Sequence, residues 1–228
     1  MIHAKELRKT YGKGASEVRA LRDVTLQIGR GEMVAVMGPS GCGKTTLLQV
    51  LAGIEPADRG ETWIDGTPLH TLKDKRLSKF RLEKMGFVFQ QYHLIDVLSV
   101  LENTALPLIA RGVPAKEAKA KASAALERVG LADKASALPS ELSGGQCQRA
   151  AIARAIVGEP QVIWADEPTG ALDSGNAEQV IGLMCKLNES LGTTVIVVTH
   201  DPAVAAKAHR ILRMDNGRIV GEGGPAHV

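Results

Sequence analysis

The segment that most constrains the fold is Gly38-Pro39-Ser40-Gly41-Cys42-Gly43-Lys44-Thr45-Thr46. An apolar run precedes it at residues 33–37, and a leucine-rich run follows at residues 47–51. A buried strand, a glycine-rich turn and a helix in this order predict a phosphate-binding loop. The alternative, a glycine-rich turn without a ligand, is disfavoured because a Lys-Thr pair ends the turn in the required register.

Each part of this loop suits a phosphate chain. The glycines allow backbone N–H groups to curl around a β-phosphate, and the helix N-terminus adds a positive field. Lys44 can reach the β- and γ-phosphates, and the Thr45 hydroxyl can ligate Mg²⁺. Cys42 is interpreted as a packing residue, with a redox-sensitive thiol as the alternative. The predicted ligand is therefore a nucleoside triphosphate with Mg²⁺.

Composition and charge restrict the class of protein. The 228 residues are 44% hydrophobic, enough for a sizeable core, and carry a net charge of +3. Because the charges are dispersed, no nucleic-acid-binding arm is predicted, and the basic run at 116–121 is interpreted as the solvent face of a helix. Three cysteines without framework spacing, no signal pattern and no apolar stretch of about 18 residues predict a soluble, cytoplasmic protein.

The hydrophobic pattern alternates between strands and helices. Alternation of apolar and polar residues predicts strands at 2–9 and 17–28, and charged residues predict a helix at 74–84. A helix is expected to begin with Pro114 at its first position and to end near Val129. Residues of about 92–158 are interpreted as a helical insertion. Continuous apolar or short strand-like runs predict further strands at 62–66, 86–89, 162–165, 194–198 and 210–221.

Polar residues follow three of the predicted buried strands. Asp166 and Glu167 come directly after residues 162–165, where a carboxylate suits Mg²⁺ and a second acid can polarise a water molecule. A solvated turn is the alternative for such an acidic pair. Gln90 follows residues 86–89, and its amide could contact Mg²⁺ or the water, with Gln91 as a rival.

His200 ends the predicted strand at 194–199. Ligands gather at the carboxyl ends of parallel strands, so a neutral imidazole here could hydrogen-bond the γ-phosphate or the attacking water. A structural histidine is the alternative. Tyr11 follows the first strand, where its ring could stack on adenine or could simply lie half-buried at the surface.

The segment Ser143-Gly144-Gly145-Gln146 predicts a second anion-binding turn. Serine followed three residues later by glutamine is a capping box, and the glycines expose N–H groups of the first helical turn. An ordinary helix start is the alternative. Two such turns beside one nucleotide site are explained by a head-to-tail dimer, and Gly170-Ala171-Leu172-Asp173 could form part of that contact.

Together these segments resemble the ATP-binding cassette (ABC) ATPases, the nucleotide-binding subunits of ABC transporters, over essentially the whole chain. The resemblance implies an α/β P-loop NTPase fold, with a mainly parallel sheet core, an antiparallel β subdomain and a helical subdomain, as one domain over 1–228. It assigns the phosphate loop to 38–46 and the signature to 142–146. Single residues are assigned as the Q-loop glutamine, the Walker B acid, the catalytic acid, the D-loop acid, the switch histidine and the adenine-stacking aromatic: Gln90, Asp166, Glu167, Asp173, His200 and Tyr11.

Finer features are similar to one subfamily, which serves macrolide exporters, lipoprotein release and antimicrobial-peptide resistance. Its permease partners are of the cell-division-permease type and tend to transmit force across the membrane. The segments that carry this similarity are residues 17–21, 87–91, 165–174 and 199–202. Trp164 and Cys147 depart from the subfamily's usual residues, but neither departure removes a chemical group.

The resemblance implies an ATPase cycle coupled to transport. Two subunits each bind ATP and Mg²⁺, with Thr45, Gln90 and Asp166 near the metal, and residues 143–146 of each cover the partner's γ-phosphate. Glu167 and His200 orient the water, and hydrolysis reopens the homodimer. Membrane permeases would dock near the Q-loop and the helical insertion, which places the protein on the inner face of the cell membrane.

Several questions stay open at this stage. Tyr92, Leu94 and Leu98 are candidates for the permease contact, and core packing is nearly as good an explanation for them. The main alternative function is a regulatory or scaffolding ABC ATPase of the cell envelope or division machinery, which moves no cargo. A cassette acting on ribosomes or DNA is disfavoured, because the chain has neither two cassettes nor long coiled coils. The resemblance implies that substrate specificity lies in the membrane subunits, and it favours export or periplasmic force transmission as the direction of action.

Overall fold

The computed structural model describes residues 1–224 and divides into two units. Unit 1 consists of Met1–Lys79 and Thr194–Val228, and unit 2 of Phe80–Thr193. The last four residues of the expected domain, 225–228, lie outside the described residues.

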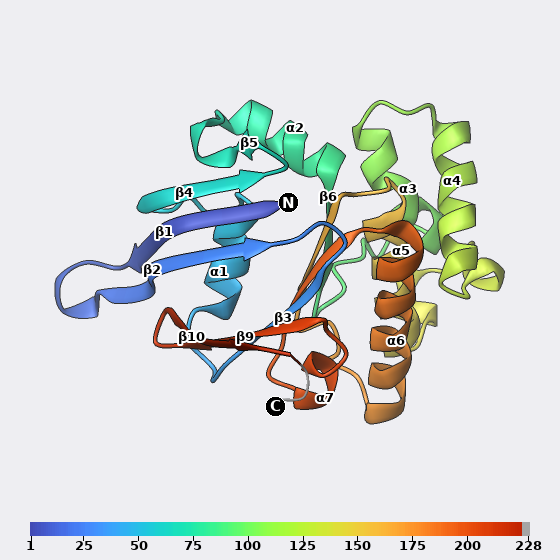
Figure 1. Ribbon diagram of the computed structural model, residues 1–228. Helices are drawn as coiled ribbons and strands as arrows, with labels where there is room; N and C mark the ends of the chain where they lie inside the picture. The colour runs from blue at the N-terminus through green and yellow to red at the C-terminus, as the bar shows by residue number, and fades with distance from the viewer. Residues whose placement is uncertain (225–228) are drawn as a thin grey trace. The chain divides into compact units, whose positions relative to one another are not determined.

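The first half of unit 1 contains an antiparallel sheet with the strand order β2-β1-β4-β5 (Figure 1). Ile2 at the centre of the sheet lies opposite Ile28 on one neighbour and Ile64 on the other, and all three are buried. The alternation that predicted strands thus places one apolar face against the core. The strands are β1 (Ile2–Tyr11), β2 (Val18–Ile28), β4 (Arg59–Ile64) and β5 (Thr67–Pro68).

Unit 1 also contains the strands that carry the phosphate loop and His200. β3 (Met33–Met37) pairs in parallel with β8 (Thr194–Val198) on one side and with β9 (Arg210–Asp215) on the other. β10 (Arg218–Gly223) closes this edge, antiparallel to β9. β3 and β8 are buried almost throughout, as their continuous apolar sequences predicted.

Unit 2 contains the parallel pair of β6 (Met85–Phe89) and β7 (Val162–Asp166). Helix α5 packs so closely on β6 that a Cβ at Gly86 would lie 2.4 Å from the carbonyl oxygen of Ala155. Residues 92–158 contain three of the helices. The α-helices of the chain are α1 (Lys44–Leu51), α2 (Asp74–Lys84), α3 (Val100–Ala110), α4 (Ala115–Arg128), α5 (Gly144–Ile156), α6 (Ser174–Leu191) and α7 (Pro202–Ala205).

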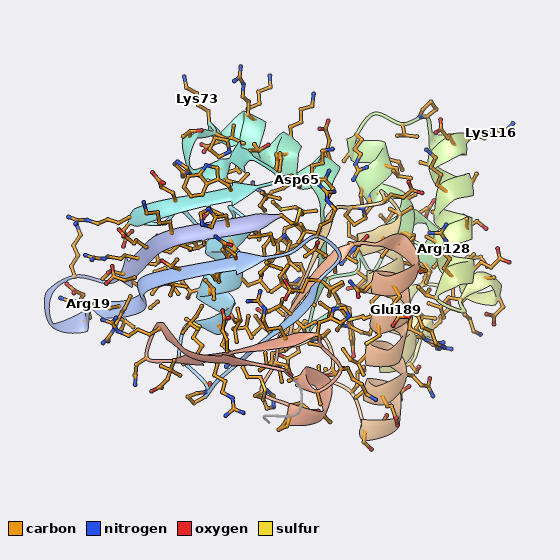
Figure 2. The ribbon with its side chains drawn as sticks, in the orientation of Figure 1. Arg19, Asp65, Lys73, Lys116, Arg128 and Glu189 are labelled. Carbon is orange, nitrogen blue, oxygen red and sulfur yellow. The ribbon has the colours of Figure 1, made fainter. Side chains whose placement is uncertain are left out.

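Helix α4 differs from its prediction at the start. Pro114 is the N-cap, with φ −54° and ψ 139°, rather than the first helical residue. Its extended ψ keeps it outside the helix, while its carbonyl oxygen accepts the bond from the Ala118 N–H at 2.9 Å. The lysine-rich side of α4 faces solvent as expected, and Lys116 points outward in Figure 2. The helix buries its other side through Ala118, Ala122, Ala125 and Leu126.

Candidate functional site

The phosphate loop joins β3 to α1 in unit 1, and its glycines are required by close contacts. A Cβ at Gly38 would lie 2.1 Å from the Met214 carbonyl oxygen, and one at Gly43 would lie 2.3 Å from the Ala20 carbonyl oxygen. Gly41 and Gly43 have φ of 77° and 103°, the left-handed region that glycine favours. The loop therefore has the curled backbone that was predicted.

Lys44 lies inside this loop and is 8% exposed. Its Nζ donates to the carbonyl oxygens of Gly38 and Pro39 at 2.8 and 3.0 Å. Two carbonyl partners hold the ammonium group over the turn, while the solvent-facing loop residues remain accessible. The exposed members are Pro39, Ser40, Gly41 and Thr45, and Thr46 is half-buried.

Cys42 is 6% exposed, which supports its interpretation as a packing residue. Its sulfur would lie 2.7 Å from a Cβ at Gly38, and its carbonyl oxygen accepts the Gly217 N–H at 2.9 Å. The thiol thus fills the space behind the loop.

Tyr11 ends β1 with 39% of its surface exposed. The Lys9 Nζ lies 5.3 Å from the centre of its ring, within the range of a cation–π contact. Lys9 is itself held by Glu55 at 2.5 Å and by the Pro56 carbonyl oxygen at 2.8 Å. This support could not be predicted from the sequence, because a basic residue two positions from an aromatic one is common on a strand.

His200 lies near the carboxyl end of β8, and Thr199 separates it from the strand. The Thr199 N–H donates to the Val36 carbonyl oxygen at 3.1 Å, so this end of β8 lies beside the end of β3 that leads into the phosphate loop. The Thr199 hydroxyl accepts the Asp201 N–H at 3.0 Å, which fixes the backbone on the far side of His200. Within unit 1, the exposed imidazole and the phosphate loop therefore lie at the same edge of the sheet, beyond the carboxyl ends of β8 and β3.

In unit 2, Gln90 and Glu167 leave neighbouring strands at the same level. Phe89 lies opposite Asp166 in the β6–β7 register, and each of the two polar residues follows directly. A Cβ at Gly170 would lie 2.9 Å from the Gln90 Nε2, so the loop after Glu167 packs against the glutamine. Gln90, Asp166 and Glu167 therefore lie close together at the carboxyl ends of β6 and β7, as their positions after the predicted strands indicated.

The predicted capping box at Ser143 is confirmed. The Ser143 Oγ accepts the Gln146 N–H at 3.3 Å, and the Gln146 Oε1 accepts the Ser143 N–H at 2.8 Å. Ser143 and Gly144 are exposed at the start of α5. A Cβ at Gly144 would lie 2.9 Å from the Tyr92 hydroxyl oxygen, so the absence of a side chain here allows the Tyr92 hydroxyl to approach the turn.

Asp173 is the N-cap of α6. Its Oδ1 accepts the Asn176 N–H at 2.9 Å, and its Oδ2 accepts the Asn176 Nδ2 at 2.6 Å. These bonds lower the pKa of the Asp173 carboxyl below its ordinary value, and the bond from the Asn176 backbone N–H has the largest effect. The aspartate thus has a structural role within its own chain.

The segment after Gln90 contains two consecutive left-handed residues, Tyr92 and His93, with φ of 56° and 49°. The Arg154 guanidinium donates to the carbonyl oxygens of both, at 2.6 Å for Tyr92. Burial lowers the pKa of Arg154 and raises that of Tyr92. Leu94 and Leu98 are half-buried in the same segment.

A largely apolar hollow of about 490 Å³ lies between β6, α3 and α5 in unit 2. Phe87 and Phe89 stack with their ring centres 6.0 Å apart on one of its walls. Three arginines line it as well, namely Arg81, Arg111 and Arg154. The sequence predicts a contact surface in this region but not its arginines, which come from α2, the end of α3 and α5.

Comparison with known proteins gives consistent matches. The family profile described as ABC transporter matches residues 21–170. The lipoprotein-releasing system ATP-binding protein LolD of Bordetella pertussis is 44% identical over 218 residues, which cover 96% of this chain and 94% of that protein. The macrolide export ATP-binding/permease protein MacB 1/2 of Paracoccus denitrificans is 45% identical over 229 residues. That match covers 99% of this chain, which spans only 34% of the longer protein.

Solved structures match equally well. The dimeric structure of the ABC transporter cassette MJ0796 superposes with a TM-score of 0.91 at 43% identity, covering 99% of both chains. A dimeric post-hydrolysis state of MJ0796 bound to ADP and Pi gives a TM-score of 0.91 at 42% identity. In the described part of the chain, 1–224, no helix combines the length and apolar character needed to cross a membrane.

Proposed function

The chain belongs to the ABC transporter family, and from that premise we propose that it is the ATP-hydrolysing subunit of a membrane transporter of the export or force-transmitting type. The observation that carries the proposal is the match to the lipoprotein-releasing system ATP-binding protein LolD, which covers 94% of the length of that protein. A macrolide export ATP-binding/permease protein is matched over 34% of its length. The cargo therefore depends on the membrane partner.

The phosphate loop fits a nucleotide. Its N–H groups lie on a curled turn where added Cβ atoms would clash with neighbouring strands, and residues 39–41 are open to solvent. We infer that Lys44 exchanges its bonds to the Gly38 and Pro39 carbonyls for phosphate oxygens. The charge-assisted bonds to phosphate are the stronger ones. Tyr11, steadied by Lys9, would stack on the adenine.

Hard oxygen ligands suit Mg²⁺, which when bound neutralises charge on the β- and γ-phosphates. The groups proposed to hold it are the Thr45 hydroxyl, the Asp166 carboxylate and the Gln90 amide oxygen. The Phe89–Asp166 register supports a shared role for the last two. Glu167 is proposed to orient and polarise the attacking water, and His200 to hydrogen-bond the water or the γ-phosphate.

The proposed homodimer rests on the cradle at residues 143–146, of which Ser143 and Gly144 are exposed. We propose that its Ser143 hydroxyl and glycine N–H groups close on the nucleotide of the partner subunit, and that Asp173 lies at that contact. The dimeric structures of MJ0796 support this arrangement. Hydrolysis would remove the anion that both subunits bind, and the dimer would reopen.

The apolar hollow between β6, α3 and α5 is the proposed permease contact, together with Tyr92, Leu94 and Leu98 of the segment that supplies His93 to its lining. Its three arginines favour an apolar segment that carries an acidic residue. We propose a permease of the cell-division-permease type, which would bring the protein to the inner face of the cell membrane. Both units would then act as one ABC domain over 1–228, with a helical insertion at about 92–158.

The experiment is capture of tagged Glu167→Gln from native membranes with Mg-ATP, with Glu178→Gln as the matched control on an exposed part of α6. The proposal predicts recovery of an integral membrane protein with a large ectodomain. Leu106→Arg in the hollow should reduce its recovery, whereas Ile109→Arg, which is 43% exposed on the same helix, should not. Recovery of only cell-wall or division proteins would instead support the scaffolding alternative, and recovery of ribosomes or DNA would support a cassette that acts on them.

A further inference from the structure

Gln148 is a polar residue on the buried side of α5, and none of its surface is exposed. Its Nε2 donates to the carbonyl oxygen of Pro168 at 2.6 Å. Its Oε1 is also buried and has no hydrogen-bond partner among residues 1–224. Because an unpaired buried oxygen lowers stability, an apolar side chain of the same size would suit a purely structural position better.

The group that Gln148 binds belongs to the loop that carries Glu167. Glu167 has φ of 47°, although a residue before proline is ordinarily extended. Such a conformation persists only where the surroundings hold it. The loop supplies two bonds of its own, from the Gly170 N–H to the Glu167 carbonyl and from the Leu172 N–H to the Thr169 carbonyl, each 3.0 Å. Gln148 adds a bond from outside the loop.

The helix that provides this bond is the one that begins at the signature. Ser143 caps α5, and Gln148 lies just over one turn later, in helical register with Gly145 on the buried side. One side-chain amide therefore connects the Glu167 loop to the helix whose exposed N-terminus carries Ser143 and Gly144.

We propose that Gln148 is a positioning residue that holds the Glu167 loop against the signature helix. The inference rests on the proposed function, in which Glu167 acts on the ATP of its own subunit and the signature on that of the partner. Gln148 then connects the two within one chain, so that closure of the signature on one nucleotide fixes the catalytic carboxylate at the other. The amide is retained despite its unpaired oxygen because the Pro168 bond sets the orientation of Glu167.

The test is Gln148→Met, which keeps the shape of the side chain and removes the donor. We expect kcat for ATP hydrolysis to fall by about 10- to 100-fold, as small misplacements of catalytic groups do. KM for ATP and ATP-dependent dimer formation should stay close to wild type. The thermal unfolding midpoint should stay close to wild type, because removal of the unpaired oxygen offsets the loss of the donor to the Pro168 carbonyl.

Two comparisons separate positioning from a general structural role. Asn188→Leu removes a matched buried amide on α6, whose Nδ2 donates to the Thr193 carbonyl oxygen at 2.6 Å, and should lower stability while kcat is kept. Adding Gln148→Met to Glu167→Gln should cause no further loss of kcat, because both changes act through the Glu167 carboxylate. A wild-type kcat in Gln148→Met, or losses that multiply in the double variant, would overturn the inference. A wild-type protein without ATPase activity would overturn the proposed function and this inference with it.

Discussion

Gly145 of α5 packs directly on Asn176 of α6, so closely that a Cβ at Gly145 would lie 2.4 Å from the Asn176 Oδ1. Asn176 cannot easily turn away, because its Nδ2 and its backbone N–H both bond to the Asp173 carboxylate. Gly145 is thus required by packing within the subunit, and in the proposed function, where residues 143–146 bind the partner's nucleotide, this packing couples that turn to the start of α6.

We therefore predict that Gly145→Ala lowers the free energy of unfolding by about 1–3 kcal/mol, the usual cost of overpacking, and reduces ATP turnover. Gly182→Ala is the matched control on α6, where an added Cβ meets nothing within 4 Å. That change should stabilise the protein by about 0.5–1 kcal/mol, because alanine favours a helix over glycine. Urea denaturation of both variants checks the prediction, and equal stability of the two would contradict it.

Asp173 gives a prediction about pH. Its pKa is lowered in the folded protein, so its cap stabilises the fold above the unfolded carboxyl pKa of about 3.9 and this contribution is lost as the pH falls through the lower folded value. Asp173→Ala should thus be less stable than wild type at pH 7, and the difference should shrink below about pH 4. Denaturation curves at several pH values measure this, and a difference that grows on acidification would disprove the cap's contribution.

Arg154 gives a prediction about the segment after Gln90. Lysine cannot replace the guanidinium fork that binds the Tyr92 and His93 carbonyls together, so Arg154→Lys should cost about 2–3 kcal/mol of stability and weaken permease binding. Arg149→Lys, at a half-buried position on the same helix, serves as the control and should have a small effect. Thermal unfolding and the membrane capture described above provide the two measurements.

Much of this architecture could be predicted from local sequence patterns. The strands around the phosphate loop, Asp166 and His200 are continuous apolar runs, and the Ser143–Gln146 capping box depends on residues three apart, so both signals are visible without tertiary structure. The start of α4 was wrong by one residue, because a proline at the N-cap and a proline at the first helical position look alike in sequence.

The supporting contacts could not be predicted in the same way. The contacts of Gln148 with Pro168 and of Arg154 with Tyr92 join residues whose meeting depends on how helices and strands pack. Lys9 and Tyr11 lie two positions apart on β1, a spacing too common on strands to indicate a contact. The clearest sequence signal for Gln148 is a glutamine in helical step with Gly145 and Ile152, on a side of α5 that is otherwise apolar. That pattern indicates burial, but it does not identify the partner.

The central claim, that Glu167 drives ATP hydrolysis in a dimer closed by ATP, is tested most directly by one paired measurement. Steady-state ATPase activity and sedimentation with Mg-ATP are recorded for wild type, Glu167→Gln and the exposed control Glu178→Gln. The account predicts a loss of turnover of about 10²- to 10⁴-fold in Glu167→Gln, the usual contribution of a general base, together with accumulation of an ATP-bound dimer. Normal turnover in Glu167→Gln, or a protein that stays monomeric with ATP, would contradict it.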